Sequence, residues 1–527
     1  MAIFLNPDNA NFNEAVHSKI YVDKTGLIEY TNSVLSTTAK FICNSRPRRF
    51  GKSMTADMLC AYYSKGCDSR ELFQPYTISS CSTFEKYINQ YDVIHIDVQW
   101  CKDQVENIKD IVNYIKESCM HELQNEYSNI DYNGIISLSG TLSKINDEIG
   151  HRFVVIIDEW DAPIREVPKT QKKYLEFLRT LFKGSGTTDK IFAAAYMTGI
   201  LPIKKDGSES AISDFWEYSM LEPGEFQSYV GFTEDEVKRL CLERNVSYEE
   251  AKRWYDGYAF DIVTSIYNPY SIMKAVTMKK FKSYWRMSSA ADALEDYIAG
   301  DYDGLFQAVL ELLGGSEIPV DTDGFNNDIT TVRNRDDVLT LLIHLGYLAY
   351  DEAEGTVRIP NEEIRIEFSK AIREVKSTEA IKRMRESNQL ILDTVQMNEG
   401  AVAAQIEKIH AEMVDPLHYN NEQSLRSIIQ IAYYSYPDYY LKFEELPSGD
   451  GYADIVYFPK RMSQMPALVI ELKWNQSAEG AIAQIKNKRY FEALQDYGGD
   501  ILLVGVNYNK DAKGGKRKHT CVIEKLT

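Results

Sequence analysis

The first 220 residues contain four short apolar runs, separated by segments with helical spacing. The runs are KFICN at 40–44, YDVIHIDV at 91–98, FVVIID at 153–158 and KIFAAAYMTG at 190–199. Apolar, β-branched runs of this kind are typical of parallel strands, because such strands are buried on both faces. The alternation therefore predicts an α/β domain over residues 1–220, in which helices cover a parallel sheet.

The first run leads into SRPRRFGKS, which places Gly51, Lys52 and Ser53 where a strand gives way to a helix. The amides and the dipole of a helix N-terminus favour phosphate at such a junction. In a phosphate-binding loop, Lys52 would reach the β- and γ-phosphates of ATP, and the Ser53 hydroxyl would bind Mg²⁺. Backbone amides from Arg49 and Phe50 onward would surround the β-phosphate.

The loop departs from the ordinary phosphate-loop pattern at its first position. The usual GxxxxGKS/T pattern has glycine where this chain has Arg46, and Pro47 removes one amide donor. Arg46, Arg48 and Arg49 could stabilise phosphate charge, reach a neighbouring subunit of a homo-oligomer, or form a solvated surface. The sequence leaves these alternatives open.

The third run ends in an acidic pair, Asp158 and Glu159. Ligands of open α/β sheets bind at the carboxyl edge of the strands, where this pair would lie. Asp158 would hold Mg²⁺ through water, and Glu159 would polarise the water that attacks ATP. Thr198, at the end of the fourth run, is the expected sensor of the γ-phosphate. An ordinary strand end is the alternative for the acidic pair, but the order of both motifs, each behind its own strand, favours ATP binding.

The middle of the chain predicts two helical regions. Over 221–330, FTEDEVKRLCLERN and SYEEAKRWYDGY show helical spacing behind Thr and Ser positions suited to N-caps. Over 331–414, the apolar helix VLTLLIHLGYL precedes a hairpin in AYDEAEGTVRIPN, as in a winged-helix fragment, and a helical connector follows as far as Pro416. Winged helices can bind DNA, but the low basic charge here favours a spacer.

A second set of catalytic residue types lies in the segment 415–527. GYADIVYFP and PALVIELKW predict two adjoining strands, and the period of two sends Glu471 and Lys473 to one face of the second. With Asp454 on the first strand, two carboxylates would bind Mg²⁺ or Mn²⁺, and Lys473 would orient or activate water. Such a set can hydrolyse phosphodiesters, although Asp followed by Glu-x-Lys also occurs by chance.

The surroundings of this set favour the catalytic interpretation. A helix that begins behind Ser477 would bring Gln484, Lys488 and Tyr490 close to the carboxylates. The preceding helix NEQSLRSIIQIAYYSY offers Glu422 as a further acidic residue. The basic cluster near the C-terminus could touch a phosphate backbone or be a solvated tail; it comprises Lys513, Lys516, Arg517, Lys518 and His519.

Charge and hydropathy limit the partners of the chain. The net charge of -19 excludes a protein that binds nucleic acid over its whole surface. The charge is uneven, because residues 401–527 hold 15 Lys and Arg against 16 Asp and Glu. No apolar run is long enough to span a membrane, no secretion signal begins the chain, and the cysteines form no CxxC pair. We therefore expect a cytoplasmic protein without a membrane partner.

Taken together, YVDKTGLI, SRPRRFGKS, VVIIDEWDAPI, GYLAYDEAEGTVRIPNEEI and GYADIVYFP with VIELKW resemble bacterial AAA-ATPase-like proteins with a C-terminal PD-(D/E)xK nuclease domain. The resemblance spans nearly the whole chain. It implies an α/β multidomain protein: a P-loop NTPase sheet, a helical and winged-helix-like middle region, and a restriction-endonuclease-like α/β domain. It implies nucleotide and Mg²⁺ binding by Lys52, Ser53, Asp158 and Glu159, and a nuclease site of Asp454, Glu471, Lys473 and Gln484. Ala453 replaces the proline of the PD name.

Three functional hypotheses follow. The first is an ATP-controlled nuclease that acts on nucleic acid, with DNA as the expected substrate. The second is a nucleotide-driven switch or scaffold whose nuclease-like domain only binds a partner, in keeping with the acidic surface of residues 1–400. The third is a sensor that binds ATP without hydrolysing it, and unchanged ATPase activity in Glu159→Gln would favour it.

Overall fold

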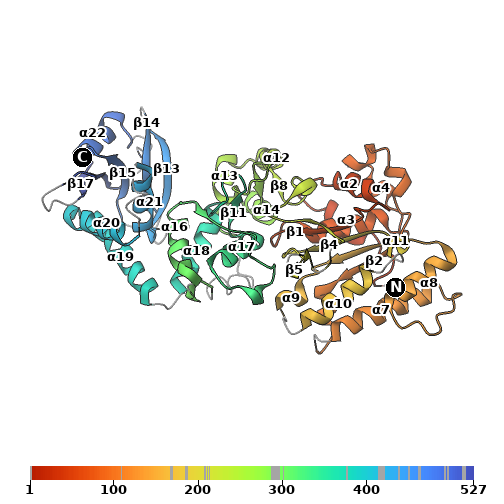
Figure 1. Cartoon of the computed structure of the whole chain (residues 1–527). Coiled ribbons are helices and arrows are strands. Elements are labelled where there is room, and N and C mark those ends of the chain that lie inside the picture. The colour runs from red at the N-terminus through yellow and green to blue at the C-terminus, as the bar shows by residue number, and fades with distance from the viewer. Residues whose placement is uncertain are drawn as a thin grey trace. The chain divides into compact units, whose positions relative to one another are not determined.

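The protein, seen here in a computed structural model, consists of two compact units (Figure 1). The N-terminal unit comprises Met1–Tyr284 and Pro319–Glu362, and the C-terminal unit comprises Trp285–Ile318 and Glu363–Thr527. The structure describes residues 3–107, 110–166, 170–183, 188–203, 205–206, 209–210, 212, 214–285, 297–300, 302–374, 378–413, 422–436, 439–448, 451–460, 465–491, 494, 498–512 and 518–526. Pro416 and the basic residues Lys513, Lys516 and Arg517 lie outside them.

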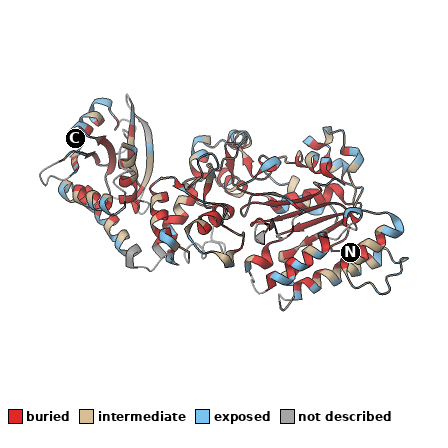
Figure 2. Ribbon diagram, viewed as in Figure 1, coloured by how far each residue is buried: buried red, intermediate tan, exposed pale blue. Residues whose placement is uncertain are grey.

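A five-stranded sheet forms the core of the N-terminal unit. Its strand order is β2-β3-β4-β1-β7, and each neighbouring pair is parallel, as the apolar runs predicted. The three inner strands are buried at every residue, because helices cover both faces (Figure 2). The strands are β1 (Phe41–Ser45), β2 (Asp92–Asp97), β3 (Phe153–Asp158), β4 (Phe192–Gly199) and β7 (Trp216–Tyr218).

Different helices cover the two faces of this sheet (Figure 1). On one face, apolar residues of α7 (Ile111–Glu126), α8 (Leu138–Ile149) and α10 (Gln171–Phe182) form one core cluster with the strands. On the other face, α3 (Lys52–Tyr63) packs against β2, β3 and β4. Shorter elements complete the domain: α1 (Ala10–Val16), α2 (Leu27–Val34), α4 (Arg70–Phe73), η1 (Thr77–Ser80), α5 (Phe84–Tyr87), α6 (Val98–Asp103), α9 (Ala162–Glu166), α11 (Thr188–Ile191), β5 (Lys205–Asp206) and β6 (Glu209–Ser210).

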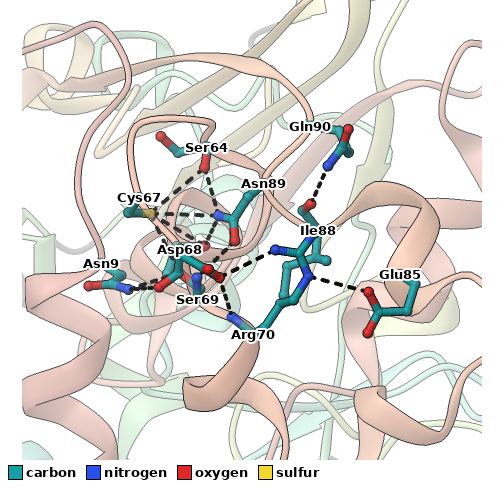
Figure 3. Close-up of polar contacts among 11 residues, drawn as sticks. Asn9, Ser64, Cys67, Asp68, Ser69, Arg70, Glu85, Ile88, Asn89 and Gln90 are labelled. Carbon is teal, nitrogen blue, oxygen red and sulfur yellow. Dashed lines mark hydrogen bonds and ion pairs between the residues drawn. The ribbon is translucent and has the colours of Figure 1, made fainter.

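A polar cluster fixes the far end of α3, the helix that begins at the predicted phosphate loop (Figure 3). The Asn89 amide donates to the carbonyls of Ala61, at 3.1 Å, and Ser64, at 2.7 Å. Its side-chain oxygen accepts from the amide of Ser69 at 2.8 Å. These contacts satisfy carbonyl groups that the end of a helix leaves without intrahelical partners. The helix is therefore anchored at the end opposite to Gly51.

The helical region predicted after residue 220 is present, and its caps are as expected. Thr233 forms a capping box with Glu236, and Ser247 accepts from the amide of Glu250. A later helix and hairpin have the predicted winged-helix-like order. The elements are η4 (Gly224–Phe226), β8 (Phe232–Thr233), α12 (Glu234–Arg244), α13 (Tyr248–Tyr255), β9 (Ile266–Tyr267), α14 (Pro269–Met278), η6 (Ile329–Thr331), α17 (Arg335–Leu345), β11 (Ala349–Asp351) and β12 (Thr356–Arg358), with β10 (Ile318–Pro319) beside β12.

The C-terminal unit is built on a mixed sheet of order β13-β14-β15-β16-β17, in which β15 and β16 pair in parallel and the other neighbouring strands pair antiparallel. Helices α19, α20 and α21 share one core cluster with the sheet, and α22 packs on the other face. The elements are η5 (Tyr302–Gly304), α16 (Leu305–Leu313), α18 (Glu362–Glu374), α19 (Thr378–Val395), α20 (Glu399–Met413), α21 (Glu422–Ala432), β13 (Tyr440–Ser448), β14 (Gly451–Pro459), β15 (Ala467–Trp474), α22 (Ala478–Lys488), β16 (Ile501–Tyr508) and β17 (His519–Lys525).

The fold is thus α/β and multidomain, as predicted. The four segments 1–220, 221–330, 331–414 and 415–527 remain a prediction, since compactness groups residues 319–362 with the N-terminal unit and residues 285–318 with the C-terminal unit. Among the described residues, no helix combines the length and apolar character needed to cross a membrane.

Candidate nucleotide and nuclease sites

The predicted phosphate loop, residues 46–51, turns sharply before α3 begins at Lys52. Gly51 has φ 96°, and Arg49 has φ 68°, so both lie in the left-handed region. A Cβ added to Gly51 would meet no described atom within 4 Å. Glycine is therefore required by backbone conformation, and the space before the helix N-terminus stays open to a ligand.

Lys52, Ser53 and Asp158 come together across the loop. The buried Lys52 ammonium donates to the Pro47 carbonyl at 3.0 Å, and desolvation lowers its pKa against the attraction of Glu159 and Asp158. Burial raises the pKa of Asp158 to about 6, although a hydrogen bond from Ser53 opposes that rise. Ser53 therefore lies beside Asp158, and Lys52 lies within the electrostatic reach of that carboxylate.

Glu159 is ion-paired, and the sequence did not predict its partner. Its φ of 51° turns the chain directly after β3. Nη2 of Arg165 lies 2.7 Å from Oε2 of Glu159, and Nε of Arg165 lies 2.8 Å from Oδ2 of Asp161. Asp161, fully buried, also accepts from the amides of Ile200 and Leu201. Asp161 therefore fixes Arg165, which holds Glu159; the spacing of Asp161 and Arg165 at i and i+4 was the available signal.

Thr198 lies on β4, between the strands that carry the loop and the acidic pair. Its residue position is paired with Asn44 of β1, and its carbonyl accepts from the amide of Trp160 at 3.0 Å. The hydroxyl of Thr198 is buried and forms no hydrogen bond with any part of the chain that the structure describes. The strand order thus puts the predicted sensor between Asn44 and the turn at Glu159.

Arg46 and Arg49 of the loop differ in environment. Arg46 is fully buried: Nη1 donates to the carbonyls of Ser45 and Tyr218, and the guanidinium lies 5.5 Å from the ring centre of Phe260. Burial lowers its pKa to about 10. A solvated surface is therefore wrong for Arg46. Arg49, by contrast, is exposed and stacks on Tyr270, 4.3 Å from the ring centre.

Residues of the helical region also contact the loop. The Phe50 carbonyl accepts from the amide of Gly231 at 3.1 Å, and the Arg48 carbonyl accepts from the Asn268 amide at 3.3 Å. The Phe50 ring packs edge-on against Tyr258, with ring centres 5.6 Å apart. Movement of the loop on ligand binding would therefore alter its contacts with this helical region.

The second site forms where β14 and β15 separate. Their ladder pairs Ile455 with Ile470 and stops there. One residue further along, Oδ2 of Asp454 accepts from the amide of Leu472 at 2.8 Å, so a side chain replaces the next backbone contact. The separation of the strands opens space for side chains at this point. Asp454 and Glu471 consequently lie at the same end of the pair.

Glu471 is the centre of this site. It is almost fully buried; its Oε1 lies 2.9 Å from Nζ of Lys473 and also accepts from Gln484. Gln484 donates in addition to the Tyr490 hydroxyl at 3.1 Å. Burial and the charge of Asp454 raise the pKa of Glu471 to about 7. The predicted residues Asp454, Glu471, Lys473 and Gln484 therefore form one constellation, whereas Lys488 is exposed.

Two residues of α21 complete the surroundings of Asp454. Nη2 of Arg426 lies 2.6 Å from Oδ1 of Asp454, a contact that the sequence reasoning missed. Burial and the charge of Asp454 raise the pKa of Glu422, so that residue lies within electrostatic reach, as predicted. Glu422 and Arg426 are four residues apart on one helix, which places them on one face and was the available signal.

The donor set of this site fits a hard divalent cation. Asp454 and Glu471 supply carboxylate oxygens, and Oε2 of Glu471 is buried without a hydrogen bond from the described residues. A bound cation would satisfy that oxygen and relieve the repulsion between the two carboxylates. No cluster of three or more His, Cys, Asp or Glu side chains is grouped like metal ligands within the described part of the chain. Water would therefore supply the remaining ligands.

Two known families match separate segments of the chain. Residues 10–208 match the family described as predicted AAA-ATPase, and residues 420–517 match the PD-(D/E)XK nuclease superfamily. The resemblance drawn from the motifs is confirmed. The AAA-ATPase-like segment contains the loop, Asp158, Glu159 and Thr198, and the nuclease-superfamily segment contains the constellation around Glu471.

Two similar proteins cover most of the chain. A protein from Azotobacter chroococcum mcd 1, described as "Uncharacterized protein in vnfD 5'region", is 21% identical over 515 residues, which cover 94% of this chain and 93% of the relative. The solved structure of the Aeropyrum pernix ORC2 protein, in ADPNP-ADP complexes, covers 70% of this chain and 98% of its own, with a TM-score of 0.31 and 12% identity.

Proposed function

We propose that the chain binds and hydrolyses ATP in its AAA-ATPase-like segment and cleaves phosphodiester bonds of DNA, with a divalent metal, in its nuclease-superfamily segment. The observation that carries the nuclease half is the convergence of Lys473 and Gln484 on Glu471, beside Asp454. We further propose that the protein is cytoplasmic and that nucleic acid is its partner. A homo-oligomer and a monomer are the two alternatives for its assembly.

In the ATP site, the roles follow from position. Lys52, now held by the Pro47 carbonyl, would exchange that acceptor for the β- and γ-phosphate oxygens. Ser53 and Asp158 would hold Mg²⁺, which neutralises phosphate charge when bound. Once Glu159 is released from Arg165, its carboxylate would accept a proton from the attacking water. The buried Thr198 hydroxyl has a donor to offer to the γ-phosphate.

In the nuclease site, Asp454 and Glu471 would hold Mg²⁺ or Mn²⁺, which lowers the pKa of bound water and stabilises charge at phosphorus. Lys473 would orient the nucleophilic water or donate to the phosphate, since its ammonium already lies beside Glu471. Gln484 is the positioning residue: its amide, held between Glu471 and Tyr490, restricts the orientation of the Glu471 carboxylate.

The decisive experiment incubates plasmid DNA with the purified protein and Mg²⁺ or Mn²⁺, with and without ATP. Wild type is compared with Lys52→Ala and Lys473→Ala, and Lys525→Ala serves as the control because this lysine forms an exposed ion pair with Asp500. We expect Lys473→Ala to abolish cleavage, Lys52→Ala to alter its dependence on ATP, and Lys525→Ala to cut like wild type.

The other results separate the competing functions. ATP turnover without metal-dependent cleavage of DNA or RNA would favour a nucleotide-driven switch or scaffold whose nuclease-like domain is a binding module. Arg426 and Lys473 already neutralise the two carboxylates, which is the observation that favours this second candidate. Nucleotide binding without turnover, unchanged in Glu159→Gln, would favour a sensor.

A further inference from the structure

The two carboxylates that would hold the metal are each already paired with a cation. Arg426 from α21 pairs with Asp454, and Lys473 pairs with Glu471, so two carboxylates face two cations. Each of the four side chains is 14% exposed or less. Ion pairs this sheltered are weakly screened, so they compete strongly with any cation that approaches the carboxylates.

The two ion pairs differ in how they can respond to a divalent cation. Lys473 belongs to β15, two residues from Glu471, and remains near that carboxylate through its own strand. Arg426 projects from a separate helix, and only one oxygen of Asp454 is committed to it, because Oδ2 accepts from the Leu472 amide. A cation that binds Oδ1 of Asp454 must therefore displace Arg426 rather than Lys473.

We propose that Arg426 exchanges partners during the reaction: it leaves Asp454 when the divalent cation binds and then contacts a phosphate of the nucleic acid. The proposal rests on the proposed nuclease function. Cation entry adds two positive charges, which exceed the one negative charge that Glu422 contributes, so the released guanidinium meets a surplus that a phosphodiester anion balances. A guanidinium presents paired donors that match phosphate oxygens, which an ammonium does not.

This exchange makes Arg426 a competitor of the metal and a ligand of the substrate. Loss of Arg426 should therefore strengthen metal binding and weaken nucleic-acid binding. Loss of an ion pair that only maintains the structure of the site would weaken both. Arg426→Ala should bind Mn²⁺ about tenfold more tightly and nucleic acid about tenfold more weakly, as expected for one charge-assisted hydrogen bond. Arg426→Lys should retain more affinity for nucleic acid than Arg426→Ala.

The test uses the full-length chain in an Asp158→Asn background, which removes the carboxylate proposed to hold Mg²⁺ in the ATP site. Calorimetry measures Mn²⁺ binding to the parent, Arg426→Ala, Arg426→Lys and Glu471→Gln. Fluorescence anisotropy measures binding of a short labelled phosphorothioate duplex in saturating Mn²⁺. Lys486→Ala is the control, because Lys486 forms an exposed ion pair with Glu524 on the same unit; it should leave Mn²⁺ affinity unchanged.

The outcomes distinguish this proposal from the proposed function. Tighter Mn²⁺ binding together with weaker duplex binding in Arg426→Ala supports the exchange. Unchanged or weaker Mn²⁺ binding in Arg426→Ala, while Glu471→Gln loses Mn²⁺, overturns the exchange and leaves the nuclease intact. Mn²⁺ binding that is absent, or that survives in Glu471→Gln, overturns the metal-dependent nuclease and the exchange with it.

Discussion

At the scale of single residues, the AAA-ATPase-like segment holds its predicted general base in an ion pair. Arg165 contacts both Glu159 and Asp161, and its side chain is 9% exposed while that of Asp161 is 0% exposed. A charge buried in this way is stabilising only while its partners remain, because each group has lost its hydration. Arg165 therefore has two roles, one in the stability of the turn after β3 and one in the availability of Glu159.

We predict that Arg165→Ala lowers the free energy of unfolding of the N-terminal unit by about 3 kcal/mol, since it leaves Asp161 buried without its cation. Urea denaturation measures the loss. Lys144→Ala is the control, because Lys144 and Glu148 form an exposed pair four residues apart on α8, and its stability should match wild type within error. Equal stability of both variants would mean that the Arg165 pairs contribute nothing.

Gly51 gives a second prediction at this scale. Gly51→Ala strains a backbone with φ 96° and puts a methyl group into the open space before α3, so we expect about 1 kcal/mol of destabilisation and at least tenfold weaker ATP binding. Gly134→Ala is the matched control: Gly134 has φ 79° and no described atom near its added Cβ. It should be destabilised similarly and bind ATP normally, as titration with a fluorescent ATP analogue would report. Unchanged ATP affinity in Gly51→Ala would exclude phosphate from this loop.

At the scale of elements, the packing of α20 on β17 joins two histidines in the C-terminal unit. The rings of His410 and His519 lie 5.1 Å apart, and His519 is fully buried with Nδ1 2.9 Å from Oε2 of Glu407. The basic cluster predicted near the C-terminus therefore does not include His519 as a surface residue: this side chain begins β17 and packs inward. Tyr508 contacts both rings from the neighbouring strand β16.

This packing predicts acid sensitivity. Burial and the nearby His519 lower the pKa of His410 from 6.5 to about 4. His410 therefore binds a proton more readily in the unfolded chain than in the folded chain. The neutral ring contributes stability that is fully present above pH 6.5 and is lost as the pH falls towards 4. As the pH falls over this interval, β17 of His410→Gln should therefore lose less protection from hydrogen exchange than β17 of wild type.

Hydrogen exchange of peptides from β17 measures that difference. Exchange is compared between wild type and His410→Gln across the same pH interval, after correction for the intrinsic pH dependence of exchange. His121→Gln, at an exposed position on α7, is the control and should behave like wild type. The same acid-induced loss of protection in all three proteins would contradict the role given to His410.

At the scale of the whole molecule, the chain passes between its two compact units three times, because residues 285–318 belong to the C-terminal unit. The AAA-ATPase-like segment lies in one unit and the nuclease-superfamily segment in the other. Ligand at the phosphate loop therefore acts first on one unit. A ligand that binds only the folded state stabilises it by about 2.7 kcal/mol at a hundred times its Kd.

We predict that Mg²⁺ and ATP raise the temperature of unfolding of the N-terminal unit more than that of the C-terminal unit. Calorimetry detects the transitions, and hydrogen exchange at rising temperature assigns each one to peptides from β3 or β15. Lys52→Ala should abolish the shift, while Lys525→Ala should retain it. An equal shift of both units in wild type would show that they unfold as one cooperative body.

The local features could be predicted from the sequence alone: the buried strands β1, β3 and β4, the junction at Gly51, the caps at Thr233 and Ser477, and the strands that carry Asp454 and Glu471. These follow from hydrophobic period, capping chemistry and backbone conformation, which neighbouring residues set. Other features depend on tertiary packing and could not be predicted: β4 lies between β1 and β3, Arg46 is buried against Phe260, Arg165 pairs with Glu159, and Arg426 pairs with Asp454. The reason is that strand order and helix packing determine which side chains meet, and segments far apart in the chain contribute to each contact.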